Sequence, residues 1–263
     1  MGLVPSIWKE QRLIESFDVD TLGRLRPQTL FAYLLNSAWN HAKGASYGHD
    51  ELSARNLMWV LIKVHILIKR LPKWGEQIAI ETWGKRRVRL YALRDFAIAS
   101  GTGEKLVSAT SSWMILDRTS GRPQRFDQQS DSLPWQPGKD EIETNLEKVQ
   151  ELNNGRELAR FRVLFSDIDV NRHVNSAKYL QWMMDSHSYE YLEATEAGSI
   201  ELSFLSEALP KDEVTVLSEG TEDQELCSVR RTGDGKELCR ARFEWRPIRI
   251  KSGYRTGSAI KNE

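Results

Sequence analysis

The sequence has only two cysteines among its 263 residues, Cys227 and Cys239. Two widely spaced cysteines cannot build a disulfide framework or a zinc site, which indicates a reducing compartment. The chain also lacks an excess of charge, because 37 basic residues balance 37 acidic ones, so nothing in the total charge favours binding to nucleic acid. No apolar run approaches the roughly 18–20 residues of a membrane span, and no secretory signal is visible. We therefore expect a cytoplasmic protein.

Histidines at metal-ligand spacing are missing as well. His41, His49, His65 and His187 are not grouped with acids or cysteines in the sequence. Bound metals in proteins usually need such a grouping. We therefore expect no metal and no cofactor.

What the chain does contain is one pattern of elements that occurs twice. The periodicity predicts a helix over residues 30–39 and then strands over residues 56–71, 77–84, 90–100 and 106–117. After a proline- and glycine-rich connector, it predicts a strand over 160–169, a helix from residue 175 or 176, and strands over 199–205, 213–220, 225–231 and 237–247. This indicates a domain over residues 1–130, a linker over 131–157, a second domain over 158–250 and a polar tail over 251–263.

Short matches support a duplicated unit of a helix and a sheet. Phe17–Val19 lies over Phe165–Asp167, and Leu71–Lys73 lies over Leu209–Lys211. The identities are few, but the elements come in the same order in both halves. The two halves are therefore predicted to share one fold.

A dense polar cluster precedes the predicted second helix. Polar side chains occupy every second position of this stretch: Asp167, Asp169, Asn171, His173 and Asn175. Asn175 or Ser176 is a suitable N-cap. The free N–H groups and the dipole of a helix N-terminus favour negative charge, such as an oxyanion forming on a substrate.

The first half does not repeat this cluster. At the aligned positions of Asp169, Asn171 and His173 it has Thr21, Gly23 and Leu25, and the position of Glu207 falls on Lys69. The fold therefore does not require the polar set, and we expect the chemistry in the second half.

Several segments together resemble one family of enzymes. The segments, in chain order, are Gly44–Gly48, Leu57–Val60, Pro72–Glu76, Thr82–Lys85, Ala109–Trp113 and Asp169–Asn175, the last followed by Tyr179 and Trp182. They resemble the acyl-acyl carrier protein (ACP) thioesterases, the plant and bacterial enzymes that end fatty acid synthesis. The resemblance covers roughly residues 10–250. It implies an α+β fold of two tandem hot-dog domains, each a curved antiparallel sheet wrapped around a central helix.

The resemblance also implies the reaction and its residues. The acidic residue of the family falls on Glu207, which would be the base that activates a water molecule. In plant members a cysteine follows that glutamate, but here the residue is Ala208, which argues against a cysteine nucleophile. Cys227 and Cys239 lie in predicted strands with no histidine nearby in the sequence, so we interpret them as structural residues.

Thioester hydrolysis needs a positioned water, a base and donors for the oxyanion. His173 can orient the water or share the proton, and Asn171 can donate to the thioester carbonyl or hold the water. Asp169 can fix Asn171 or accept from helix N–H groups. The backbone N–H groups near Val174 and Asn175 are candidates for the oxyanion hole. Each of the four side chains also has a simpler interpretation. Glu207 also fits an exposed glutamate in a turn, and His173 a packed histidine. Asn171 also fits an asparagine that forms a turn, and Asp169 a cap at the helix N-terminus.

Substrate binding is expected to involve the first half. Trp39 and Trp59 are candidates to line an acyl pocket, although core packing is the commoner role of such residues. Arg86 and Arg87 lie in a basic run that suits docking of acidic ACP, although a charge run is usually a solvated surface.

Alternatives remain open from the sequence. The same fold also suits an acyl-CoA thioesterase, a dehydratase, or a protein that binds acyl chains or acyl-ACP without turnover. Acyl chain length, formation of a homodimer, and which of Glu207 and His173 takes the proton are likewise open.

Overall fold

The computed structural model describes residues 5–125, 135–143 and 146–248. The polar tail predicted over residues 251–263 lies outside this range. The first half contains β1 (Trp8–Leu13), the 3-10 turn η1 (Ser16–Asp18), α1 (Pro27–Gly44), α2 (His49–Ser53), β2 (Leu57–Ile68), β3 (Gln77–Val88), β4 (Tyr91–Ser100) and β5 (Lys105–Asp117). The second half contains β6 (Arg156–Arg162), η3 (Phe165–Asp167), α3 (Ser176–Asp185), α4 (Tyr189–Ala194), β7 (Thr195–Phe204), β8 (Glu213–Gly220), β9 (Gln224–Arg231) and β10 (Glu237–Pro247).

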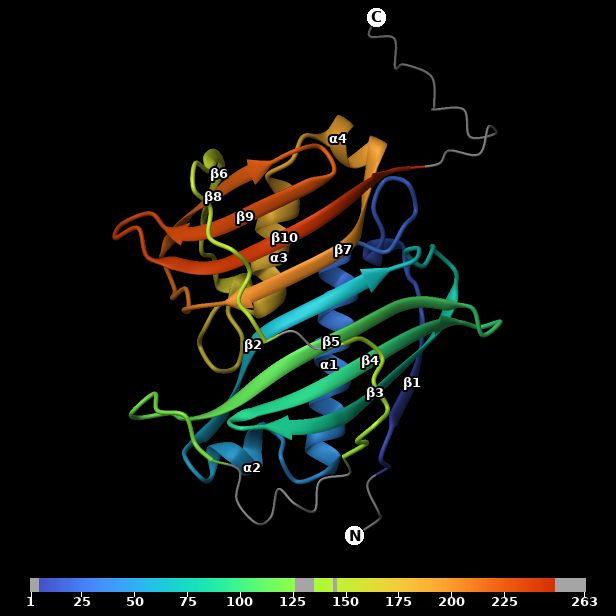
Figure 1. Ribbon diagram of the computed structural model, residues 1–263, viewed down its shortest axis with the longest axis vertical. Coiled ribbons are helices and arrows are strands. Elements are labelled where there is room, and N and C mark those ends of the chain that lie inside the picture. The colour runs from blue at the N-terminus through green and yellow to red at the C-terminus, as the bar shows by residue number, and fades with distance from the viewer. Residues whose placement is uncertain (1–4, 126–134, 144–145, 249–263) are drawn as a thin grey trace, which may run out of the picture.

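Within the described residues, the strands form one ten-stranded sheet in the order β1-β3-β4-β5-β2-β7-β10-β9-β8-β6. Each half of this order mirrors the other when β1 is matched with β6, β3 with β8, β4 with β9, β5 with β10 and β2 with β7. The equivalent strands β2 and β7 pair antiparallel at the centre, where Ile66 lies opposite Ile200. The duplicated unit therefore joins its two copies through a continuous sheet (Figure 1).

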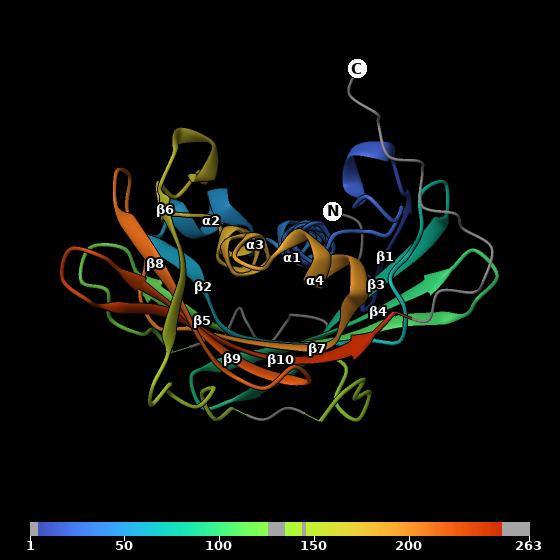
Figure 2. The same cartoon turned by 90° about the horizontal axis from the view of Figure 1, so that it is seen from above.

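The sheet is curved, and the helices lie on its concave side (Figure 2). α1 and α3 lie side by side over the centre of the sheet (Figures 1 and 2). The chain that leads into β6 crosses the convex side (Figure 2). This arrangement leaves the concave side, beneath α1, for a binding site.

The central helices form because their apolar residues recur at helical spacing. Pro27 occupies the first turn of α1, where its missing N–H costs nothing. Leu30, Phe31 and Leu34 are then completely buried against the sheet. Burial of each such side chain contributes about 1.5–3 kcal/mol. Packing of this face therefore holds α1 on the concave side.

Part of the connector packs on the convex side of the sheet, where it contacts the buried side chains of Lys85 and Trp83. Lys85 has no exposed side-chain surface, and its Nζ lies 3.0 Å from Asp140 Oδ1 and 3.3 Å from Asp95 Oδ2. Trp83 Nε1 donates to the carbonyl oxygen of Lys139 at 2.8 Å. These contacts fix residues 139–142 against β3 and β4.

The alignment of the two halves differs from the prediction by one residue around the polar cluster. Asp18 and Asp167 each accept an N–H from the residue three positions earlier. Each is followed by an equivalent bridge, Val19–Leu25 and Ile168–Val174. The predicted alignment with Thr21, Gly23 and Leu25 is therefore wrong. The true counterparts of Asp169, Asn171 and His173 are Asp20, Leu22 and Arg24.

The turn near Glu207 is also shifted. Gly75 and Lys211 occupy equivalent positions, because both have positive φ, 76° and 74°, in turns of the same hydrogen-bond pattern. Leu71, rather than Lys69, is then the counterpart of Glu207. The first half still lacks the histidine and the glutamate, whereas Asp169 does have a counterpart there.

Candidate active site

The carboxylate of Glu207 lies directly against the ring of His173. Their Oε2 and Nε2 atoms are 2.7 Å apart. Glu207 follows β7, and His173 precedes α3, so the contact joins the sheet to the start of the helix. The side chains are 53% and 31% exposed, which leaves the pair accessible to water and to a ligand.

The hydrogen bond changes the acidity of both groups. It raises the pKa of His173, because the carboxylate favours the protonated ring. It lowers the pKa of Glu207, because the ring favours the ionised carboxylate. Glu207 is therefore ionised at neutral pH and accepts from His173 through one oxygen, which leaves its other oxygen for a water molecule.

The position of Glu207 is fixed by its neighbour in the chain. Ala208 is completely buried, and its N–H donates to Tyr179 Oη at 2.8 Å. Arg231 Nη2 also donates to the carbonyl oxygen of Glu207 at 3.0 Å. The turn that carries the carboxylate is therefore held by α3 and β9.

The loop before α3 is shaped by Asp169. Its Oδ1 accepts the N–H of Asn171 at 2.8 Å and that of His173 at 3.4 Å. Arg172 between them has φ of 65°, which lets the chain reverse. Asn175 ends the loop as the N-cap of α3, since its Oδ1 accepts from Ala177 N at 2.9 Å. Asp169 thus sets where Asn171 and His173 stand.

Asn171 is held from the other half of the chain. Arg118 Nη2 donates to Asn171 Oδ1 at 2.7 Å, and Arg118 Nε donates to the carbonyl oxygen of Leu57 at 3.1 Å. The contact with the Arg118 cation identifies which end of the Asn171 amide is the oxygen, because only the oxygen can accept. The Nδ2–H donors at the other end can therefore point toward a ligand.

The N–H groups of Val174 and Asn175, near which the oxyanion hole is predicted, both have acceptors within the chain. The N–H of Val174 donates to the carbonyl oxygen of Ala208 at 3.3 Å, and that of Asn175 donates to the carbonyl oxygen of Asp167 at 2.8 Å. Both donors are needed by the loop itself. The sequence could not show this, because Ala208 reaches the loop only in the folded chain.

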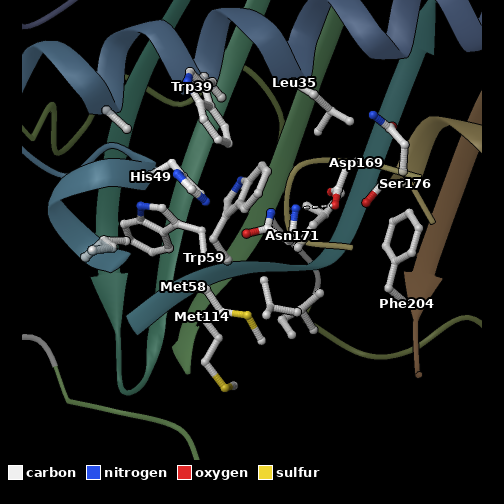
Figure 3. A pocket seen from close by; sticks show the side chains of 18 of the residues that line it. Leu35, Trp39, His49, Met58, Trp59, Met114, Asp169, Asn171, Ser176 and Phe204 are labelled. Atoms are coloured by element: carbon white, nitrogen blue, oxygen red, sulfur yellow. Dashed lines mark hydrogen bonds between the residues drawn. The ribbon is translucent and has the colours of Figure 1, made fainter. Parts of the chain in front are cut away.

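A cavity of about 1130 Å³ connects these residues with the first half. It lies between α1 and the sheet, and Glu207, His173, Asn171, Val174 and Asn175 all line it. The predicted pocket residues Trp39 and Trp59 line it too, with Trp39 stacked on His49 at 5.7 Å between ring centroids. Figure 3 shows Trp39, His49 and Trp59 gathered on one side of the pocket and Asn171 with Asp169 on the other.

Family models match both halves of the chain. The model of the acyl-ACP thioesterase N-terminal domain matches residues 5–130, and that of the C-terminal domain matches residues 150–247. The chain belongs to the acyl-ACP thioesterase family. The family predicted by resemblance is thereby confirmed.

Individual relatives agree with this assignment. The chain is 26% identical to a chloroplastic palmitoyl-ACP thioesterase of Cuphea hookeriana over 92% of this chain and 62% of that protein, so it spans about three fifths of that relative. An acyl-ACP thioesterase structure from Bacteroides thetaiotaomicron aligns with a TM-score of 0.81 at 26% identity, covering 94% of this chain and 100% of that one. The 12:0-ACP thioesterase of Umbellularia californica, 24% identical, shares the fold with a TM-score of 0.83 over 94% of this chain and 100% of that chain. The predicted α+β fold of two tandem hot-dog units is confirmed.

The cysteines of this acyl-ACP thioesterase family member are not placed for nucleophilic attack. Cys227 and Cys239 are completely buried, and burial raises the pKa of both thiols. Among the residues that the structure describes, no group of three or more His, Cys, Asp or Glu side chains could hold a metal ion. In the same part of the chain, no helix is long and apolar enough to cross a membrane.

The basic run sits on β3, apart from the polar pair in sequence. Arg86 is 42% exposed and pairs with Asp140 at 2.8 Å. Arg87 is exposed, and its guanidinium lies 5.9 Å from the ring centroid of Trp135. The connector therefore partly neutralises this surface, which the sequence alone did not reveal.

The arginines that line the cavity were not predicted from the sequence. Arg118 and Arg94 both line it, the first beside Asn171 and the second on β4. Neither falls in a recognisable motif. Only the contacts made after folding distinguish them from the other arginines.

Proposed function

We propose that this protein hydrolyses the thioester of fatty acyl-ACP to a free fatty acid and holo-ACP by means of an activated water. The observation that carries the proposal is the 2.7 Å contact between Glu207 and His173 beside a cavity large enough for an acyl chain. Membership of the family supports the substrate class. The relatives and structures named above are called ACP thioesterases, which agrees with it.

In the proposed reaction, His173 donates its Nε2–H to one oxygen of Glu207. The free oxygen takes a proton from water while the water oxygen adds to the thioester carbon. The carbonyl oxygen becomes an oxyanion, which the Nδ2–H of Asn171 stabilises. When the oxyanion collapses, the C–S bond breaks, and the departing thiolate takes the proton back from Glu207. Glu207 is thus the base, and His173 keeps it ionised and oriented.

Glu207→Gln tests this role. The amide keeps the size of the side chain but cannot take a proton, so kcat on acyl-ACP should fall about 100-fold or more. Glu222→Gln, at an exposed turn before β9, is the matched control and should retain wild-type kcat. Release of the thiol, followed with a thiol reagent, measures both.

Two outcomes would overturn the proposal. The first is a Glu207→Gln enzyme that turns over as fast as the control. The second is a wild-type protein that binds acyl-ACP tightly without releasing thiol, as a non-catalytic binding protein would. Comparison of kcat/KM on acyl-ACP and acyl-CoA separates the ACP enzyme from an acyl-CoA thioesterase.

ACP is the partner that we propose, with docking through Arg86 and Arg87. We also propose a cytoplasmic location, because both cysteines are unpaired, as is usual in a reducing compartment. The Cuphea relative, by contrast, is chloroplastic. A homodimer and the domain limits given above also remain proposals.

A further inference from the structure

Arg94 places a positive charge inside the cavity. It lies on β4, opposite Gly84 of β3 and Ser111 of β5, and its side chain lines the cavity beneath α1. The side chain of Arg94 donates two hydrogen bonds, both from Nη1. One goes to His41 Nδ1 at 3.1 Å and the other to Thr82 Oγ1 at 3.0 Å. Nε and Nη2 have no partner among the described residues.

Neither partner of Arg94 carries a negative charge. His41 Nε2 lies 2.9 Å from the carbonyl oxygen of Pro5 and must donate to it, so Nδ1 is the acceptor and the ring is neutral. Burial lowers the pKa of His41 to about 4, which agrees with a neutral ring. Burial also lowers the pKa of Arg94 to about 10, which leaves the guanidinium protonated at neutral pH. Arg94 is therefore a cavity cation with no acidic partner among the described residues.

Arg118, which also lines the cavity, donates both to the Leu57 carbonyl and to the Asn171 amide oxygen, and two further cations have a carboxylate partner. Arg12, which lines the same cavity, has its Nε 3.1 Å from Glu10 Oε1. Lys63, whose side chain is only 8% exposed, lies 2.9 Å from Glu201. Within the described residues, by contrast, no carboxylate lies within ion-pair distance of Arg94. Arg94 is half-buried, and a charge that is partly removed from water without an acidic partner is costly, so the position favours an anion brought by a ligand.

The walls near Arg94 indicate what kind of molecule would bring the anion. Trp113 and Ala92 line the cavity on the sheet side, and Trp39 lines it on the helix side. At Gly84 the ring of Trp135 lies 3.0 Å from where a Cβ would stand, and both residues line the cavity. The guanidinium is thus reached through apolar walls, which suits a hydrocarbon chain that ends in a charged group.

We propose that Arg94 binds a carboxylate carried by the acyl chain at the end distant from the thioester. This rests on the proposed function, because the thioester would lie at Glu207 and His173 in the same cavity. The planar guanidinium offers Nε and Nη2 on one edge, which matches the two oxygens of a carboxylate. The substrate class is then acyl thioesters with a second, distal carboxylate.

The test compares pairs of acyl-ACP substrates of equal chain length, one plain and one with a terminal carboxylate. The measured quantity is the ratio of kcat/KM for the carboxylated to the plain substrate. Arg94→Met should lower this ratio about 10- to 100-fold, the effect of losing a hydrogen bond to a charged group. Arg94→Lys should lower it less, because it keeps the charge but not the planar pair of donors. Arg12→Met, which removes a charge already paired with Glu10, should leave the ratio as in wild type.

A binding experiment decides the same question without turnover. Calorimetry with wild-type protein should show tighter binding of a free α,ω-dicarboxylate than of a monocarboxylate of the same length, and Arg94→Met should abolish the difference. Equal binding of the two acids to wild type, or an unchanged kcat/KM ratio in Arg94→Met, would refute the proposal. If wild type hydrolyses neither thioester, the proposed function fails, and calorimetry still decides whether Arg94 binds the carboxylate. If Arg94→Met does not fold, as thermal unfolding would show, Arg94→Lys and the binding of the two acids to wild type decide the question.

Discussion

Asn171 depends on an arginine from the opposite half of the chain. Arg118 is 53 residues away in sequence, yet its guanidinium occupies the amide oxygen at 2.7 Å. It also lies near enough to His173 to lower the pKa of that ring, against the larger effect of Glu207. Arg118 is therefore a positioning residue for the proposed reaction, because it acts on the substrate only through Asn171 and His173.

Replacement of Arg118 should affect the chemical step more than substrate binding. In Arg118→Met the amide of Asn171 is free to rotate, so kcat should fall about 10- to 100-fold with a smaller change in KM. Loss of the nearby positive charge should move the pKa of His173 upward, which an NMR titration of its ring measures. Arg122→Met, exposed on the turn after β5, is the matched control for both measurements. A purely structural role of Arg118 predicts an unshifted pKa of His173.

The pair of Glu207 and His173 could be predicted, and Arg118 could not. Glu207 was predicted from the resemblance to the family, and His173 and Asn171 were predicted from the alternating polar residues. The N-cap at Asn175 followed from residue type and local spacing, because a cap bonds within its own first turn. Arg118 and Arg94 act through contacts across the fold, and no local pattern marks such contacts.

At the level of elements, the loop before each central helix is built in the same way. Asp20 Oδ1 accepts the N–H groups of Leu22 and Arg24, both at 2.9 Å. Asp169 Oδ1 accepts from the equivalent residues, Asn171 and His173. The aspartate is therefore part of a loop structure that both halves share. In the second half, Asn171 and His173 are carried on that loop.

The duplication supplies its own control for Asp169. Asp169→Ala and Asp20→Ala each remove an acceptor for two backbone N–H groups, so each should lower the free energy of unfolding by about 1–3 kcal/mol. Only Asp169→Ala should also lower kcat, because its loop carries Asn171 and His173. Asp169→Asn keeps an oxygen acceptor and should restore much of both. Denaturant unfolding and steady-state kinetics measure the two effects, and an equal loss of kcat in Asp20→Ala would contradict this division.

The register of the repeat could not be read from short identities. The sequence comparison rested on Phe17 with Phe165 and on two Leu-Pro-Lys strings, and both matches are displaced in the structure. Backbone conformation and hydrogen bonds define the true register, as Gly75 and Lys211 show by sharing positive φ with unlike side chains. The order of elements was predictable because it follows from periodicity, which tolerates a shift of one or two residues.

In the whole molecule, the two halves depend on each other. The pair of Glu207 and His173 belongs to the second half, while residues of the first half, many of them on α1 and β2, line most of the cavity. Strands β2 and β7 join the halves within one sheet. The candidate site is therefore formed by the two halves together, and neither copy of the duplicated unit contains both the cavity and the pair of Glu207 and His173.

We proposed acidic ACP as the partner, and a protein with no net charge would have to bind it through a local basic surface. The segment with Arg86 and Arg87 is our candidate, although Asp140 already pairs with Arg86 at 2.8 Å. Changing both arginines to glutamate should raise KM for acyl-ACP about 10-fold or more and leave hydrolysis of a small thioester unchanged, because reversed charge repels an acidic partner. The matched control reverses Arg156 and Arg162, which are exposed on β6 at the opposite edge of the sheet.

The salt dependence of KM provides a second measurement of this docking surface. Rising ionic strength should raise KM for acyl-ACP in wild type and change it less in the Arg86→Glu, Arg87→Glu variant, because screening acts on an attraction that the variant has lost. The small thioester carries no acidic protein, so its KM should not depend on the two arginines. Equal effects of the reversal on both substrates would mean that the segment acts through the structure of β3 and the connector. An effect of the β6 control as large as that of the β3 variant would mean that ACP senses only total charge.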